Sequence, residues 1–162
     1  NGEKLFSRSK QTFDNAIPAA NSIAVSIFNT LFLITSNPKY DQYLQKLINS
    51  YGIEIEKFSR SFSMLLNSFQ ETLTSKAEIV IFENEQPDTA KIFLDTINQK
   101  FNPSYNLLYV TKENLRNISE YAPFIKNFNL SDVSKVYICK NHVCELPVSS
   151  VEQLEKALEN LV

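Results

Sequence analysis

The sequence predicts an α+β or α/β chain in which N-terminal helices precede a small four-stranded mixed sheet. Apolar residues recur at intervals of three and four through the first half, which is the spacing of amphipathic helices. From residue 77 onward the period changes, and short β-rich runs alternate with helical patterns. A closing hairpin and helix complete the order βαβαββα. We therefore expect a helical segment at residues 1–75 and a small α/β domain at residues 76–162.

Three helices with short connections are expected in the helical segment. The first follows Pro18, since proline is tolerated near a helix start, and it is apolar over most of its circumference. Its apolar positions are Ile23, Ile27, Leu31 and Ile34, and its narrow polar stripe is Ser22, Ser26, Asn29 and Thr30. A helix of this kind is normally covered on several sides, so we expect it to be buried. The second helix runs from 38 to 51, and 53–58 is either its continuation or a separate segment. The third spans 62–73. The three helices together leave an apolar face bare unless something covers it.

The second half begins with a strand at 78–82, followed by a helix that Asp88 caps and a strand at 106–111. A strand, helix and strand of this length predict a right-handed parallel crossover. Thr111 can cap a short helix. After the hairpin, Ser149 and Glu152 form a capping box for the last helix. The order of these elements matches the core of a thioredoxin-like fold, although other small α/β domains share it.

Both cysteines and the only histidine lie in the hairpin at 136–148. A two-residue turn at 141–142 places Cys139 opposite Cys144 as a non-hydrogen-bonded pair. A reversible disulfide is one interpretation of this pair. The other, which we favour, is two small apolar residues on one sheet face, because no helix N-terminus is evident to lower a thiol pKa. His142 could join the cysteines on zinc, but no fourth ligand is evident, so we expect no metal.

Composition argues against several functions. A net charge of −2 and a pI near 5.5 disfavour nucleic-acid binding. Two glycines are too few for a phosphate-cradling loop, and one histidine on a turn excludes a serine–histidine–acid triad, so we expect no cofactor and no complete active site. Whether the chain belongs to an enzyme stays open. The apolar run at 23–34 is too short to span a membrane, and few cysteines with no signal peptide favour the cytoplasm.

A polar group at the entrance of the first helix is the best candidate for a binding site. Asp14, Asn21 and Ser22 lie there. Their alternative role is helix capping and loop hydrogen bonding, which we favour.

Two segments resemble one family. The sequence from Phe13 to Ser22 resembles the Asp-Gly-Ala-x-Pro-Ser-Gly-Asn-Ser segment of the thioredoxin-domain-containing proteins, whose mammalian members are called spermatogenesis-associated. The hairpin with Cys139 and Cys144, its Leu-Pro-Val ending and the helix that follows resemble that family's C-terminus. The resemblance runs from about residue 6 onward. Asn15 and Ala20 stand where the family usually has glycine, and Ala19 where serine is common.

The resemblance implies a larger protein with an N-terminal thioredoxin-like domain, an (α/α)6 barrel like that of six-hairpin glycosidases, and a small α/β tail. This chain would be its noncatalytic C-terminal portion, with the last barrel hairpins in residues 1–75. Asp14, Asn21 and Ser22 would then edge a substrate pocket. The expected partner is the remainder of the protein. Alternatives are a carbohydrate-binding or sugar-isomerising barrel, and an interaction module whose exposed helical face binds a partner or a second copy.

Overall fold

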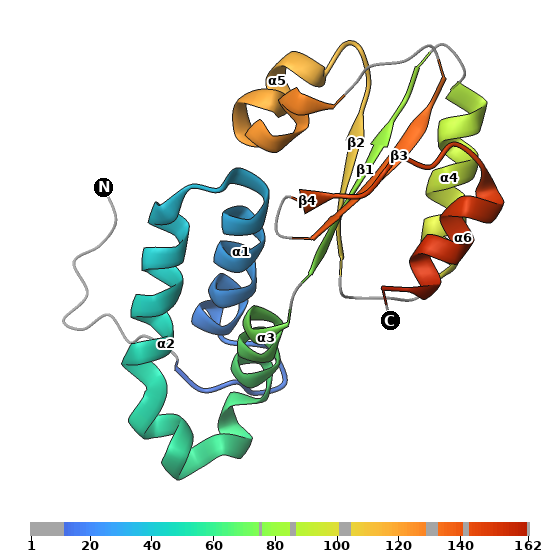
Figure 1. The fold of residues 1–162 in the computed structure, drawn as a ribbon. Coiled ribbons are helices and arrows are strands. Elements are labelled where there is room, and N and C mark those ends of the chain that lie inside the picture. Colours follow the sequence, from blue (N-terminus) through green and yellow to red (C-terminus); the bar gives the residue numbers. More distant parts are fainter. Residues whose placement is uncertain are drawn as a thin grey trace.

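The computed structural model describes residues 12–74, 76–84, 87–100, 105–128, 133–140 and 143–161. The helical layer consists of α1 (Ala20–Thr35), α2 (Pro38–Phe58), the 3-10 helix η1 (Ser59–Phe62) and α3 (Ser63–Leu73). The remaining elements, in chain order, are β1 (Ala77–Phe82), α4 (Pro87–Gln99), β2 (Tyr105–Val110), α5 (Leu115–Tyr121), η2 (Pro123–Asn127), β3 (Lys135–Lys140), β4 (Val143–Cys144) and α6 (Val151–Glu159) (Figure 1). The predicted mixed α+β class is confirmed.

The four strands of the described chain form one mixed sheet with the order β2-β1-β3-β4. The central strand β1 pairs in parallel with β2 and antiparallel with β3, and β4 adds to β3 as an antiparallel edge strand. The predicted parallel crossover through α4 and the predicted final hairpin are both present. A further bridge joins Val136 to Val148, with both backbone hydrogen bonds at 2.9 Å. This bridge holds the chain against β3 until α6 begins.

Helices cover both faces of the sheet. On one face, α4 and α6 pack against alternate residues of β1 and β3, with Phe93 and Leu154 at the centre of this core (Figure 1). On the other face, α5 and η2 pack over Val80 and Tyr137, and Ile34 near the end of α1 reaches the same cluster. Every residue of β1 is buried. A strand buried on both faces is read as a continuous apolar run, which the sequence of β1 nearly is.

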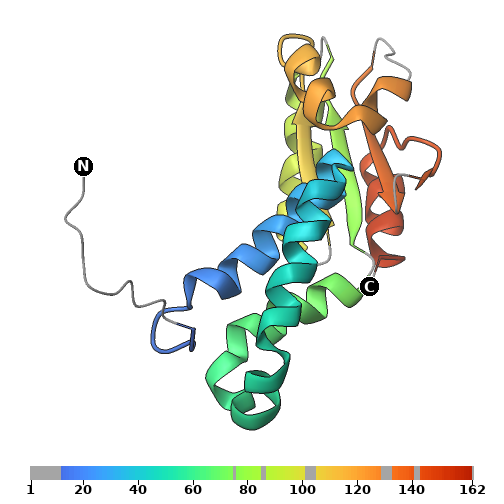
Figure 2. The ribbon, with the colours of Figure 1, turned by 90° about the vertical axis from the view of Figure 1, so that its left-hand side faces the viewer.

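The helical layer extends beyond one end of the sheet, and α1 contacts both α2 and α3 (Figure 2). Its core consists of Val25, Leu44, Tyr51, Phe62 and Leu65. α2 continues through Gly52 to Phe58, so the segment 53–58, which the sequence pattern left open, extends the second helix. Among the described helices, none is long and apolar enough to cross a membrane.

The expectation that α1 is buried through its apolar stripe is wrong. Ile23 and Ile27 are 37% and 50% exposed, whereas Ser22 and Asn29 of the polar stripe are 1% and 5% exposed. Ser22, Val25 and Asn29 lie three and four residues apart, so they share one helix face. Their small side chains let α2 and α3 approach closely. The bulky isoleucines consequently point away from the layer's core.

Three predicted caps need correction. Ser150, not Ser149, is the N-cap of α6: its hydroxyl accepts from the Gln153 backbone N–H at 3.3 Å, and Gln153 reaches back to the Ser149 N–H at 3.1 Å. The capping box starts one residue later than predicted because Val148 is paired with Val136, so the helix begins further along the chain. Asp88 lies inside the first turn of α4, where its charge favours the helix dipole. Thr111 caps the turn before α5 rather than the helix itself, since it accepts from the Asn114 N–H.

Candidate functional site

Asp14 is a structural hub of the helical layer. One carboxylate oxygen accepts the Ala19 backbone N–H at 2.8 Å, and the other accepts the N–H groups of Met64 and Leu65 at 3.0 and 3.1 Å. The last two donors lie in the first turn of α3, where helices leave N–H groups unpaired. Asp14 therefore joins the loop before α1 to the start of α3 across about fifty residues of sequence.

The electrostatics of Asp14 agree with this geometry. Burial by itself raises the pKa of the carboxyl group. The hydrogen bonds from the Ala19 backbone, the Ser22 side chain and the backbone of Leu65 and Met64 outweigh burial and lower the pKa below its ordinary value of 3.8. Three N–H donors and a nearby helix N-terminus favour the charged form. Asp14 consequently stabilises the fold as a carboxylate.

The other two candidates from the sequence lie near Asp14. Asn21 donates from its side-chain amide to the hydroxyl of Tyr51 on α2, and Ser22 is buried on the inner face of α1. None of the three lines the large groove described next. Their role at the edge of a substrate pocket remains a prediction.

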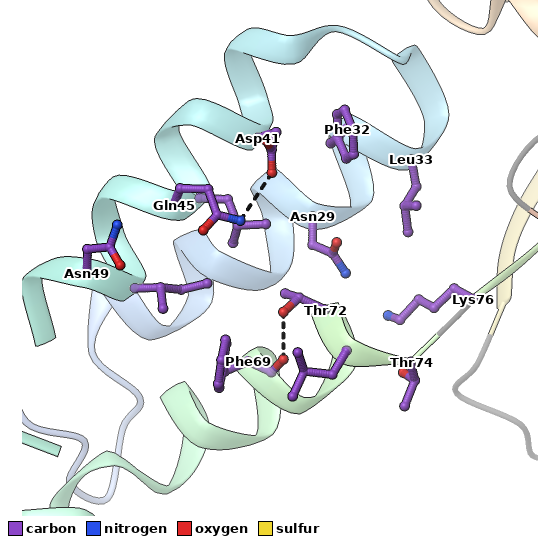
Figure 3. Close-up of a pocket in the computed structure, with 13 residues that line it drawn as sticks. Asn29, Phe32, Leu33, Asp41, Gln45, Asn49, Phe69, Thr72, Thr74 and Lys76 are labelled. Carbon is purple, nitrogen blue, oxygen red and sulfur yellow. Dashed lines mark hydrogen bonds between the residues drawn. The ribbon is translucent and has the colours of Figure 1, made fainter. Parts of the chain in front are cut away.

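An open groove of about 700 Å³ lies among α1, α2 and α3 (Figure 3). Polar side chains from all three helices and from the start of β1 line it beside the rings of Phe32 and Phe69: Asn29, Asp41, Gln45, Asn49, Thr72, Thr74 and Lys76. On one wall, the Gln45 amide donates to the Asp41 carboxylate at 3.4 Å. The groove thus offers amide and hydroxyl groups, together with the charged Asp41 and Lys76, next to two aromatic rings.

Asn29 is the most informative residue of the groove. Its side chain points into the groove in Figure 3 and is 5% exposed, and its amide nitrogen makes no hydrogen bond with any residue that the structure describes. A buried polar group without a partner costs about 1–3 kcal/mol. Such a group is tolerated where a ligand or water completes its hydrogen bonds. The sequence pattern placed Asn29 in the polar stripe of α1, but it did not predict that this side chain would face a groove.

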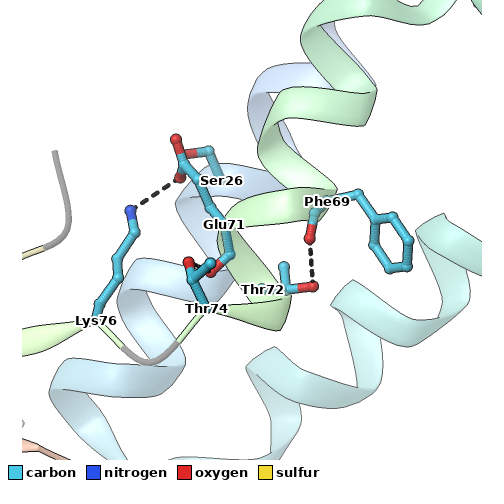
Figure 4. Close-up of polar contacts among 6 residues, drawn as sticks. All are labelled: Ser26, Phe69, Glu71, Thr72, Thr74 and Lys76. Carbon is cyan, nitrogen blue, oxygen red and sulfur yellow. Dashed lines mark hydrogen bonds and ion pairs between the residues drawn. The ribbon is translucent and has the colours of Figure 1, made fainter.

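Lys76, which lines the groove, belongs to a polar network with Glu71 and Ser26 (Figure 4). The Lys76 ammonium group pairs with the Glu71 carboxylate at 2.9 Å, and the same oxygen accepts the Ser26 hydroxyl at 3.2 Å. Lys76 is only 8% exposed. Because it precedes β1 directly, this ion pair ties the helical layer to the first strand of the sheet.

The carboxyl ends of the parallel strands β1 and β2 form a second, smaller hollow of about 220 Å³, lined by Glu83 and Thr111 among others. Beside it, the Tyr109 hydroxyl donates to the Glu83 carboxylate. Burial, and then the hydrogen bond and negative charge of Glu83, raise the pKa of Tyr109 to about 12. The phenol is therefore a stable hydrogen-bond donor at neutral pH.

The cysteine pair has the predicted register. Cys139 lies opposite Cys144 and Lys140 opposite Val143, and a disulfide joins the two cysteines with their Cα atoms 3.9 Å apart. The next pair along is hydrogen-bonded, from the Glu145 N–H to the Ile138 carbonyl at 3.0 Å, so the cysteines occupy a non-hydrogen-bonded position. The turn itself, with His142 and the zinc alternative, lies outside the described residues.

Two polar residues that the sequence reasoning did not single out share a row with this disulfide. The sheet register aligns Asn106, Glu78, Cys139 and Cys144 across the four strands. Glu78 is 1% exposed and Asn106 9%. The sequence could have identified Glu78 as unusual, since it is the only charged residue in the apolar run of β1. The register across the sheet was needed to place it beside a disulfide.

These features define a mixed α+β protein in which a grooved helical layer adjoins a four-stranded sheet. The chain is similar to Spermatogenesis-associated protein 20 of Rattus norvegicus (22% identical), Homo sapiens (21%) and Mus musculus (22%), in each case over 158 residues. Each alignment covers 97% of this chain and 20% of the relative, so the chain spans about a fifth of the relatives' length. No family model and no solved structure matches the chain.

Proposed function

We propose that this chain is the noncatalytic C-terminal portion of a larger thioredoxin-domain-containing protein, and that the outer face of α1 packs against the remainder of that protein. The observation that carries this proposal is the orientation of α1. Its polar side faces α2 and α3, while Ile23 and Ile27 form an exposed apolar ridge one turn apart. Neighbouring exposed apolar side chains of this kind are suited to contact with another protein surface.

The length of the relatives indicates that the surface covering this ridge belongs to the same polypeptide. The relatives are about five times as long as the aligned segment, so most of their chain lies outside the part that this structure describes. A barrel of paired helices, as the family resemblance implies, would cover α1 on the side that α2 and α3 leave open. The ridge is short, which suits a contact within one polypeptide, where association carries no loss of translational freedom.

The α/β half has a thioredoxin-like arrangement in this proposal. The order βαβαββα and the sheet order β2-β1-β3-β4, with one parallel and two antiparallel pairs, support it. The shared order describes architecture alone and carries no activity by itself.

A cysteine-labelling experiment tests the docking of α1. Ile27→Cys is compared with Ile92→Cys, a matched isoleucine that is 51% exposed on α4. Both should react quickly with a maleimide in this chain alone. In the complete polypeptide, Ile27→Cys should be protected at least about tenfold while Ile92→Cys stays reactive. Equal labelling of Ile27→Cys in both contexts would contradict docking, and protection in this chain alone that grows with its concentration would instead show pairing with a second copy.

The groove supports a second candidate function, binding of a carbohydrate. The unpartnered Asn29 amide, the neighbouring amides and hydroxyls, and the rings of Phe32 and Phe69 are the groups that recognise neutral, hydroxyl-rich ligands. Both oxygens of Asp14 already accept backbone hydrogens, so Asn29 is the sharper probe of this idea.

A glycan panel against the complete polypeptide tests the second candidate. Asn29→Leu should abolish binding, because it removes the donor and narrows the groove, while Asn67→Leu, outside the groove lining, serves as the control. Absence of any glycan bound by the unaltered protein would remove this candidate. Undiminished binding in Asn29→Leu would place the site elsewhere, and loss in Asp14→Ala with correct folding would return attention to the entrance of α1.

A further inference from the structure

The disulfide joins β3 to the edge strand β4, and its two cysteines differ in exposure. Cys139, on β3, is 1% exposed, whereas Cys144 on the edge strand β4 is half-buried. Val143, the other residue of β4, is 76% exposed, and Leu146, shortly after the strand, is 90% exposed. A reagent from solvent therefore reaches the Cys144 sulfur more readily than the Cys139 sulfur.

A buried carboxyl group adjoins the less accessible sulfur. Glu78 is the direct antiparallel partner of Cys139, and both side chains emerge on the same sheet face. Cβ atoms of directly opposed residues lie about 4.5–5.5 Å apart, a distance that a glutamate side chain spans easily. Asn106 continues the row on the other side of Glu78, and its amide nitrogen has no hydrogen-bond partner among the described residues.

The cost of a buried negative charge determines whether Cys139 leaves as a thiolate or as a neutral thiol. A thiolate leaving from Cys139 would be an anion inside the sheet, and burying an uncompensated charge is costly. Two adjacent anions, a thiolate and a carboxylate, would cost more still. The Cys139 sulfur is thus the better leaving group when it takes up a proton as the sulfur–sulfur bond breaks. The Glu78 carboxyl group lies where it can supply that proton.

We propose that Cys139–Cys144 is a reversible thiol–disulfide site for a dithiol partner, attacked at Cys144, with Glu78 as the proton donor to Cys139. A thiolate of the dithiol attacks the Cys144 sulfur, forming a mixed disulfide while the bond to Cys139 breaks. The Cys139 sulfur takes the electron pair of the broken bond and a proton from the protonated form of the Glu78 carboxyl group. Glu78 becomes a carboxylate and regains a proton from water.

The second thiol of the dithiol completes the reaction. It loses its proton to solvent and attacks the mixed disulfide at the partner's own sulfur, so that Cys144 leaves as a thiolate and takes a proton from water. The dithiol is oxidised to a disulfide, and two electrons reduce Cys139–Cys144 to two thiols. This activity concerns the sheet and does not depend on the docking of α1.

The order of attack is tested with single-cysteine variants and oxidised glutathione, followed by mass spectrometry. Cys144, left alone in Cys139→Ser, should form the mixed disulfide at least about tenfold faster than Cys139 left alone in Cys144→Ser. Equal rates, or a faster reaction of Cys139, would overturn the assignment of Cys144 as the attacked sulfur. These variants keep Glu78 and so give a result even if substitutions at Glu78 fail to fold.

The role of Glu78 is tested by reducing the native disulfide with dithiothreitol and counting alkylated thiols over time. Glu78→Gln should slow reduction about tenfold or more, the scale of a lost proton donor, and Glu78→Asp should recover part of the rate. Glu83→Gln, just beyond the other end of the same strand, is the matched control and should react like the unaltered chain. Equal rates in Glu78→Gln and Glu83→Gln, with native circular dichroism in both, would overturn the proton-donor role. A disulfide reduced only when the chain unfolds would overturn the site as a whole.

Discussion

The α/β half and the helical layer bury their residues by opposite rules. In the sheet, Ile79, Val80 and Ile81 are all fully buried, because helices cover both faces. In the helical layer, α1 turns Ser22 and Asn29 inward and leaves Ile27 half exposed. The difference teaches that the sheet completes its own core, whereas the helical layer buries polar side chains of α1 and leaves apolar ones in solvent.

Two charged groups connect the helical layer through hydrogen bonds and an ion pair. Asp14 joins the loop before α1 to α3, and the Glu71–Lys76 pair joins α3 to the start of β1. Both interactions are at least partly shielded from water. Substitutions in the two regions should therefore have effects of different size and different pH dependence.

The largest effect is expected in the core of the sheet. Phe93→Ala should lower the free energy of unfolding by about 3–5 kcal/mol, because Phe93 is 1% exposed and its loss leaves a cavity against β1 and α6. Urea denaturation measures the change. Its neighbour Ile92 is 51% exposed, so Ile92→Ala should stay within about 0.5 kcal/mol of the unaltered chain. Similar losses in both variants would contradict a self-contained sheet core.

The next largest effect is expected at Asp14. Asp14→Asn should lower the free energy of unfolding by about 1–3 kcal/mol at neutral pH, because it weakens charge-assisted bonds to three backbone N–H groups. Since the folded pKa lies below 3.8, the contribution of Asp14 is present above that pH and is lost as pH falls through the folded pKa.

Urea denaturation between pH 2 and pH 7 measures this dependence. The difference between the unaltered chain and Asp14→Asn should shrink as the pH falls below 3.8. Asp88→Asn, in the exposed first turn of α4, should change stability by less than about 1 kcal/mol. A difference that stays constant down to pH 2 would show that packing, rather than the carboxylate charge, explains the role of Asp14.

A gain in stability is expected when the inward polar residue of α1 becomes apolar. Asn29→Leu should raise the free energy of unfolding by about 1 kcal/mol, because it removes a buried amide nitrogen without a partner and adds apolar contact beside Leu44. The midpoint of thermal unfolding measures it. A loss of stability would mean that bound water already satisfies the amide, and would weaken the case for a ligand there.

The smallest effect is expected on the outer ridge. Ile27→Ser should change the free energy of unfolding of this chain by about 0.5 kcal/mol or less, since half of the side chain already lies in solvent. Calorimetry of the two proteins side by side measures the difference. A loss above about 1.5 kcal/mol would show that the ridge contributes to the core of this chain and is not reserved for another surface.

Local sequence patterns predicted most of the elements. The alternation of helical and β-rich runs placed each of the four strands, and the turn spacing predicted Cys139 opposite Cys144. Patterns of this kind succeed because helix period, strand length and hairpin register depend on neighbouring residues. The cap of α6 was misplaced by one residue because the Val136–Val148 bridge is a contact with another strand.

The amino-acid sequence alone determined the mixed class, the helix and strand order and the chemistry available at each position. Only the tertiary structure decided which side of α1 faces inward, that Asp14 caps α3, and that Glu78 lies beside Cys139. The physical reason is that a helix with several apolar sides has more than one face that it can bury. The choice among them depends on how closely α2 and α3 approach, and on sheet pairings between residues some sixty positions apart.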